Sequence, residues 1–122
     1  MAARVFQIAY DRTLLHVREM LLAQCGYTVA SACGNSEACQ LLATEAPFDA
    51  FFVSWSATHD ERKAIVLWLK QHWPSVPVVA IHDSFQSPIP GADFIATHDT
   101  PQEWLAAIEV ATRPIGGARA LA

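Results

Sequence analysis

The sequence predicts an α/β domain built on a parallel sheet. Three short apolar runs without helical spacing, at residues 5–9, 50–53 and 78–81, support this, and helical patterns lie between them. A strand that is apolar along its whole length is buried on both faces, as in parallel sheets covered by helices. In such sheets the chemistry lies beyond the carboxyl ends of the strands, so these ends are where we look for a functional site.

The first strand, at residues 5–9, leads into a helix over about 12–25. Asp11 is its expected N-cap. The apolar residues of this helix predict one buried stripe, formed by Leu14, Leu15, Val17, Met20, Leu21 and Leu22. Gly26 is placed to end the helix in the left-handed conformation, and a second strand is expected at 27–32.

The middle of the chain predicts two further helices on either side of the strand at 50–53. Ser36 is the expected cap of a short helix that runs to about residue 44. The inward residues of that helix are predicted to be Ala38, Leu41 and Leu42. Thr58 and Glu61 have the spacing of a capping box and open a helix that runs to about residue 72.

The last third of the chain predicts two strands and one helix. The strands are expected at 78–81 and 93–96, and the helix at 101–112. Pro88 and Pro90 forbid a regular helix between these strands, so we expect a loop there. Thr100 is the expected cap of the last helix, with Pro101 at its first position.

The composition is that of one folded domain without a membrane-spanning segment. The 122 residues are 52% hydrophobic and include four Trp and six Phe, which is enough to fill a core. The net charge of −4 comes without a stripe of Lys and Arg, so we expect no nucleic-acid binding and a protein as partner. No stretch approaches the roughly 20 apolar residues that span a bilayer, and no signal peptide is evident. We therefore expect a soluble, cytoplasmic chain that does not act on membranes.

Three cysteines, Cys25, Cys33 and Cys39, are odd in number and match no zinc spacing. We expect them to be small buried hydrophobic residues in a reducing compartment. We expect no bound cofactor.

The order of these elements resembles the receiver domain of bacterial response regulators, and four local patterns support the resemblance. They are Gly26-Tyr27 at the second strand, Pro47 and Asp49 before the third, Pro77 before the fourth, and Gly91-Ala92-Asp93 before the fifth. The resemblance covers Arg4 to about Ala111. It implies a five-stranded parallel sheet of the flavodoxin-like (CheY-like), doubly wound type, with the helix before the fifth strand shortened or lost. The receiver-like domain then spans 1–113, and 114–122 is a carboxyl-terminal tail.

The family's active-site positions have all changed in this sequence. In the family, an acidic pair after the first strand holds Mg²⁺, and an Asp at the end of the third strand accepts phosphate. Here the pair falls on Ala9 and Tyr10, with Asp11 one place later, and the phosphoacceptor position falls on Ser54. The family chemistry needs carboxylates to hold the cation and to form the acyl phosphate. The chain therefore looks like a degenerate receiver, or pseudo-receiver, in which Ser54 is not expected to be phosphorylated.

The remaining family positions have changed in the same way. The Ser or Thr that ends the fourth strand is replaced by His82, and the Lys that ends the fifth strand is replaced by Thr97. Thr58 and Arg62 stand where the family's loop after the third strand has Pro and Gly.

Three residues near these positions have alternative interpretations. Ser54 is interpreted as a hydrogen-bonded hydroxyl at the edge of the core, because nothing in the sequence identifies a base or kinase that would activate it. Tyr10 either gates the site or packs over the first strand, and we favour packing. Trp55 either covers the vacated pocket or lies on the surface for a partner, and the sequence does not separate these two.

Histidine and aspartate residues are expected to gather at one edge of the molecule. They are Asp11, His59, Asp60, His82, Asp83, His98 and Asp99, each at or just past the end of a predicted strand. Imidazole and carboxylate together suit zinc or another transition metal. Loop tips are generally polar, however, and no two of these residues have the close spacing of a ligand helix, so a solvated edge is the preferred interpretation.

The sequence thus predicts a non-catalytic domain of bacterial signal transduction that binds a protein partner or effector domain without phosphoryl transfer. It is not expected to be an enzyme, because no nucleophile, base and orienting group can be assembled from its motifs. Loss of a helix should leave apolar surface near Trp104 exposed, so we expect a homodimer through this region. The alternative function is a ligand- or metal-sensing domain that uses Asp11, His59, His82 and His98.

Overall fold

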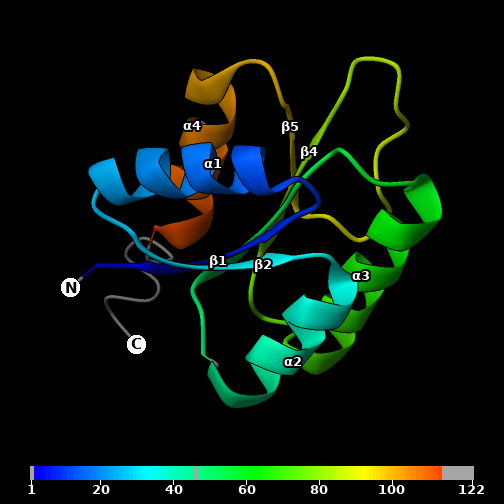
Figure 1. The fold of residues 1–122 in the computed structure, drawn as a ribbon, viewed down its shortest axis with the longest axis horizontal. Coiled ribbons are helices and arrows are strands. Elements are labelled where there is room, and N and C mark those ends of the chain that lie inside the picture. Colours follow the sequence, from blue (N-terminus) through cyan, green and yellow to red (C-terminus); the bar gives the residue numbers. More distant parts are fainter. Residues whose placement is uncertain (1, 46, 114–122) are drawn as a thin grey trace.

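The computed structural model describes residues 2–45 and 47–113 as a five-stranded, entirely parallel sheet with four helices (Figure 1). In chain order the elements are β1 (Arg4–Ala9), α1 (Arg12–Gln24), β2 (Thr28–Cys33), α2 (Asn35–Glu45), β3 (Ala50–Val53), α3 (His59–His72), β4 (Val78–His82), β5 (Phe94–Thr97) and α4 (Pro101–Thr112). The strand order is β2-β1-β3-β4-β5, which is the flavodoxin-like, doubly wound order. The predicted fold class is confirmed. The tail expected at 114–122 lies outside the described residues.

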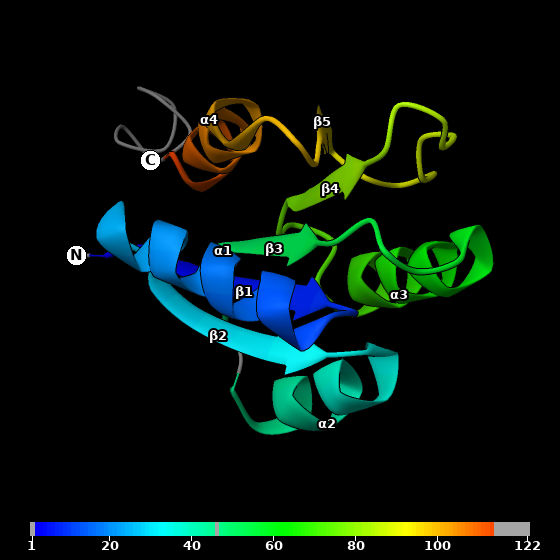
Figure 2. The same ribbon diagram turned by 45° about the horizontal axis from the view of Figure 1, so that its top comes forward.

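Two helices cover each face of the sheet (Figures 1 and 2). Successive side chains of a strand point to opposite faces, so each central strand contributes to two cores. Phe51 of β3 belongs to the cluster under α2 and α3, whereas the next residue, Phe52, belongs to the cluster that contains Trp104 of α4 and Leu22 of α1. All four residues of β3 are buried, as the uninterrupted apolar run predicts.

The carboxyl ends of the strands meet at one edge of the sheet. Backbone hydrogen bonds hold this edge together: the Ser54 N–H donates to the Ile8 carbonyl over 2.9 Å, and the His98 N–H donates to the His82 carbonyl over 3.1 Å. The residues that follow the strands are therefore neighbours. We call this region the carboxyl edge.

The predicted starts of α1 and α3 are confirmed by capping hydrogen bonds, and the predicted stop of α1 is confirmed by the conformation of Gly26. The Asp11 carboxylate accepts from the Leu14 N–H at 3.0 Å, and Gly26 adopts a φ of +93°, which favours glycine. At the start of α3 the Thr58 hydroxyl accepts from the Glu61 N–H at 3.1 Å and lies 3.2 Å from the Glu61 carboxylate. Thr58 is therefore the N-cap of α3, where the spacing of Thr58 and Glu61 predicts the helix to begin.

The predicted apolar stripe of α1 is partly wrong. Leu15 and Leu22 are buried, but Val17 and Met20 are exposed. The helical period places residue 18 between these two buried positions, and the third buried residue of α1 is Arg18. A charged side chain thus occupies a core position.

One predicted cap is wrong, and a second is confirmed only in its position. Ser36 lies inside α2, which begins at Asn35, and the Glu37 carboxylate reaches back to accept the Cys33 N–H at 3.1 Å. Thr100 precedes α4, but its side chain makes no capping hydrogen bond.

The cysteines are free, and the expectation that all three are buried is wrong. Cys25 is exposed because α1 ends one residue earlier and the turn that follows lies on the surface. Cys33 and Cys39 are half-buried, and burial raises the pKa of the Cys39 thiol.

The loop between β4 and β5 contains no helix, as predicted from its prolines. Ile89 is 3% exposed and fills the core beneath the loop. Gly91 has a φ of +90°, and a Cβ there would lie 3.4 Å from the Val66 side chain of α3. The loop thus packs on α3 through one buried apolar side chain and one close approach of its backbone. None of the described helices is long and apolar enough to cross a membrane.

Candidate functional site

Ser54, which follows β3, lies buried between two arginines at the carboxyl edge. Arg18 Nη1 donates to Ser54 Oγ at 2.9 Å, and Arg62 Nε donates to the Ser54 carbonyl at 2.9 Å. Ser54 is 1% exposed, Arg18 4% and Arg62 1%. The Ser54 hydroxyl is therefore a buried hydrogen-bond acceptor for a guanidinium group, in line with its interpretation as a satisfied core-edge hydroxyl.

Arg62 joins the ends of two strands. Its Nη2 donates to the Ile81 carbonyl of β4, while its Nε is bonded to Ser54 beyond β3. The fork of the guanidinium group suits two acceptors at once. The third nitrogen, Nη1, is buried and has no hydrogen-bond partner among the described residues.

The two arginines concentrate positive charge in the interior of the carboxyl edge. Within residues 2–45 and 47–113, neither forms an ion pair with a carboxylate. Burial lowers the pKa of Arg18 to about 10, although the charge of Asp11 acts in the opposite direction. Burial also lowers the pKa of Arg62, against the influence of Tyr10. Burying a charge without an ion-pair partner lowers the stability of the fold, so the two guanidinium groups are an unusual feature of this edge.

Tyr10, which follows β1, is packed and hydrogen-bonded. Its hydroxyl donates to Asn35 Oδ1 at 2.7 Å, and Asn35 Nδ2 donates to the Glu61 carbonyl at 2.9 Å. The ring packs against the cluster under α2 and α3, as favoured in the sequence analysis. Burial raises the pKa of Tyr10, while the charge of Arg62 opposes this shift.

The magnesium ion that the resemblance implies does not fit these residues. Ala9 is buried and has no donor side chain, the Tyr10 hydroxyl is bonded to Asn35, and Ser54 faces a guanidinium group. Mg²⁺ binds carboxylate and phosphate oxygens in a compact shell. Here it would meet two guanidinium groups, and Asp11 is engaged as the cap of α1.

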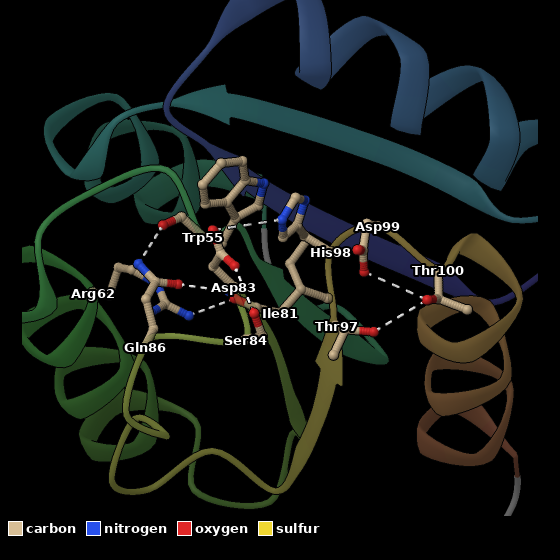
Figure 3. A network of polar contacts seen from close by, with 10 residues as sticks. All are labelled: Trp55, Arg62, Ile81, Asp83, Ser84, Gln86, Thr97, His98, Asp99 and Thr100. Carbon is tan, nitrogen blue, oxygen red and sulfur yellow. Dashed lines mark hydrogen bonds and ion pairs between the residues drawn. The ribbon is translucent and has the colours of Figure 1, made fainter.

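A second group of residues connects the ends of β3, β4 and β5 (Figure 3). The His98 imidazole stacks on the Trp55 indole, with ring centroids 3.9 Å apart, and its Nε2 lies 4.0 Å from Asp83 Oδ2. Gln86 completes the group, because its Nε2 donates to the Trp55 carbonyl at 3.0 Å and its Oε1 accepts the Asp83 N–H at 2.8 Å. Trp55 is half-buried against the core that α1 and α4 cover, with Nε1 unpaired among the described residues.

Thr97, at the family's Lys position, is tied to α4. Its N–H donates to Glu103 Oε1 at 3.1 Å, and its hydroxyl lies 3.1 Å from Glu103 Oε2 and 3.3 Å from the Thr100 hydroxyl. These contacts explain why the Thr100 side chain makes no capping hydrogen bond to α4. Thr97 thus holds α4 against β5 and does not supply the positive charge that a lysine would supply at this position.

The structure does not gather the predicted histidine and aspartate residues into a metal site. Within the described parts of the chain, no three His, Cys, Asp or Glu side chains are placed to hold a metal ion. Only His98 and Asp83 approach each other among the ion pairs of this edge. His59 and Asp60 are exposed on the first turn of α3, and Asp99 is exposed beside Thr100. His82 is half-buried, with Nδ1 unpaired among the described residues.

The sequence analysis did not identify two residues that form contacts at the carboxyl edge, Arg18 and Gln86. Arg18 stands three residues after Leu15 and four before Leu22, so helical spacing could have identified a charge on a buried face. Nothing local marks Gln86, because its partner Trp55 is 31 residues away in the sequence.

Comparison of the sequence with models of protein families gave no match, and neither did comparison with curated proteins. Many solved structures, in contrast, share the fold. A response regulator receiver domain from Clostridium thermocellum has a TM-score of 0.80 at 19% identity, over 90% of this chain and 94% of that chain. The response regulator TrrA from Thermotoga maritima, solved in complex with Mg(2+)-BeF, has a TM-score of 0.77 at 12% identity, over 93% and 100%. The receiver domain of a signal transduction histidine kinase from Syntrophus aciditrophicus has a TM-score of 0.74 at 19% identity, over 97% and 93%. The fold of this chain is that of the receiver domains.

Proposed function

We propose that this chain is a pseudo-receiver domain of bacterial signal transduction, which binds a protein partner or effector domain without phosphoryl transfer. The observation that carries the proposal is the pair of buried arginines on Ser54, at distances of 2.9 Å. They stand where phosphoryl transfer would need carboxylates and a metal ion. A guanidinium group is a cation without an acceptor atom, so it can neither coordinate a metal ion nor form an acyl phosphate. The Ser54 hydroxyl accepts from Arg18 and has no base beside it.

The proposal also excludes an enzymatic activity. Catalysis by a side chain requires a nucleophile, a base within hydrogen-bond reach and a group that orients the base. At the carboxyl edge the hydroxyls of Ser54, Tyr10 and Thr97 are each engaged with a structural partner. The only carboxylate among these partners is Glu103, which also accepts the Thr97 N–H and so serves to hold α4 to β5.

The test is treatment with acetyl phosphate and Mg²⁺ followed by mass spectrometry of the intact protein. We expect the mass to stay unchanged, both in the native chain and in Ser54→Asp, because the cation would still lack its other carboxylates. TrrA, whose structure holds Mg(2+)-BeF, is the positive control for a parallel titration with Mg²⁺ and beryllofluoride. A mass increase that maps to the carboxyl edge would reject the proposal.

The surface around the β4–β5 loop and α4 is the proposed partner surface. Phe85 of this loop is 96% exposed, and Ile95 of β5 and Val110 of α4 are also exposed. The burial of such apolar side chains on association is favourable, and a homodimer through this surface is part of the proposal. The neighbour from Syntrophus aciditrophicus, which belongs to a histidine kinase, supports protein partners for this fold.

A further inference from the structure

A cavity of about 420 Å³ lies between the start of α3 and the β4–β5 loop. It is lined by Ala57, Thr58, His59, Arg62, Gln86 and Ser87. Its volume falls within the range of small-molecule sites in proteins. Arg62 belongs to α3 and Gln86 to the β4–β5 loop, and Figure 3 shows both side chains.

Arg62 places a buried positive charge in the wall of this cavity. The side chain is 1% exposed, its pKa is lowered by burial, and its Nη1 has no partner among the described residues. Arg18 adds a second unpaired cation beyond Ser54. Because such charges are costly inside a protein and act strongly across a medium of low dielectric constant, they favour an anion nearby.

The remaining wall offers groups that suit an anion. Ser87 and His59 can donate hydrogen bonds, and Gln86 has a second N–H besides the one that it donates to Trp55. The first backbone N–H groups of the 14-residue helix α3 add a partial positive charge. Two carboxylates oppose the anion, Asp60 and Glu61 of the same turn. The Glu61 carboxylate contacts the Thr58 hydroxyl and lines the adjoining hollow, which shares Ala57, Thr58 and Gln86 with this cavity.

From this arrangement we infer that the cavity binds a small molecule through a phosphate group, without covalent transfer. A tetrahedral oxyanion matches the donors of the wall and complements the buried guanidinium charge. The cavity also has room for an organic part of a phosphate ester. The inference does not depend on the proposed partner, because it concerns the domain alone.

The experiment compares two variants that change the net charge equally. Ser87→Glu puts a carboxylate into the wall of the cavity, and Gln71→Glu puts one on the exposed far end of α3. Thermal unfolding is followed with inorganic phosphate and with glycerol phosphate, against sodium chloride at matched ionic strength. A ligand that binds only the folded state raises the melting temperature in proportion to its occupancy.

We expect phosphate or its ester to raise the melting temperature of the native chain and of Gln71→Glu, and to have little effect on Ser87→Glu. If glycerol phosphate raises the melting temperature of the native chain more than inorganic phosphate does, the cavity binds a phosphate ester. If the two ligands raise it equally, the cavity binds the phosphate group alone. No shift with either probe, or equal shifts in both variants, would overturn the inference. Because binding leaves the protein mass unchanged, failure here is distinguishable from failure of the phosphodonor test.

Discussion

The indole of Trp55 and the imidazole of His98 stack with their centroids 3.9 Å apart and their planes 23° from parallel. One residue follows β3 and the other follows β5, so the stack spans the strand between them. The same imidazole lies 4.0 Å from the Asp83 carboxylate, which follows β4. Three loops of the carboxyl edge thus meet at one ring.

This stack should be measurable as a coupling energy. In a double-mutant cycle of Trp55→Ala and His98→Ala, urea unfolding should give a coupling of about 0.5–1.5 kcal/mol, because aromatic pairs contribute this much beyond their buried area. His59→Ala is the control, since His59 is exposed on α3, and it should change the free energy of unfolding by less than about 0.5 kcal/mol. Strict additivity of the two stack mutations would show that the rings do not interact.

The Arg18 contact with Ser54 should stabilise the fold. Ser54→Ala removes the acceptor of a buried guanidinium group, so we expect a loss of about 1.5–3 kcal/mol in the free energy of unfolding. Ser56→Ala, two residues on and exposed, should be nearly neutral. Equal stability of the two variants, by chemical unfolding, would mean that water or another group replaces Ser54 at no cost.

Tyr10 should make stability fall at alkaline pH. Burial raises its pKa, so above about pH 10 the unfolded chain loses a proton that the folded chain retains. Its contribution is therefore complete below about pH 10 and is lost as the pH rises further. Arg18 has the opposite sign in this range, because its pKa is lowered, but it is present in both proteins that are compared.

The comparison is between the native chain and Tyr10→Phe. At neutral pH we expect the native chain to be more stable by about 1 kcal/mol, from the hydrogen bond to Asn35. This advantage should shrink above about pH 10, as measured by urea midpoints at several pH values. A constant difference across the alkaline range would contradict the shifted pKa.

Self-association through the β4–β5 region should depend on Ile95. This side chain is 41% exposed on β5, on the opposite side of the strand from Ala96, which belongs to the core under α1 and α4. Ile95→Lys should shift sedimentation toward the monomer, because a charge replaces apolar area at the interface. Val17→Lys is the matched control on α1, where Val17 is 49% exposed, and it should leave the association unchanged. A native chain that stays monomeric at high concentration would refute the dimer.

The sequence alone determined the α/β class, the order of elements and most helix ends. These follow from short-range physics: the apolar run of β3, the N-cap at Thr58, the left-handed turn at Gly26 and the prolines of the β4–β5 loop each act within a few residues. The resemblance to receiver domains placed Ala9, Tyr10, Ser54, His82 and Thr97 at strand ends, and the structure puts them there.

Tertiary structure decided what surrounds those positions. Arg18 and Arg62 come from two helices, 36 and 8 residues from Ser54 in the sequence, and only the packing of α1 and α3 on opposite faces of the sheet brings both to one residue. Gln86 reaches the Trp55 carbonyl from the β4–β5 loop, and His98 reaches the Trp55 ring from the segment between β5 and α4. No local pattern encodes the paths of these two segments. Long-range contacts of this kind depend on which helix packs beside which strand end. The positive charge of Arg18 and Arg62 at the carboxyl edge could therefore be identified only from the folded structure.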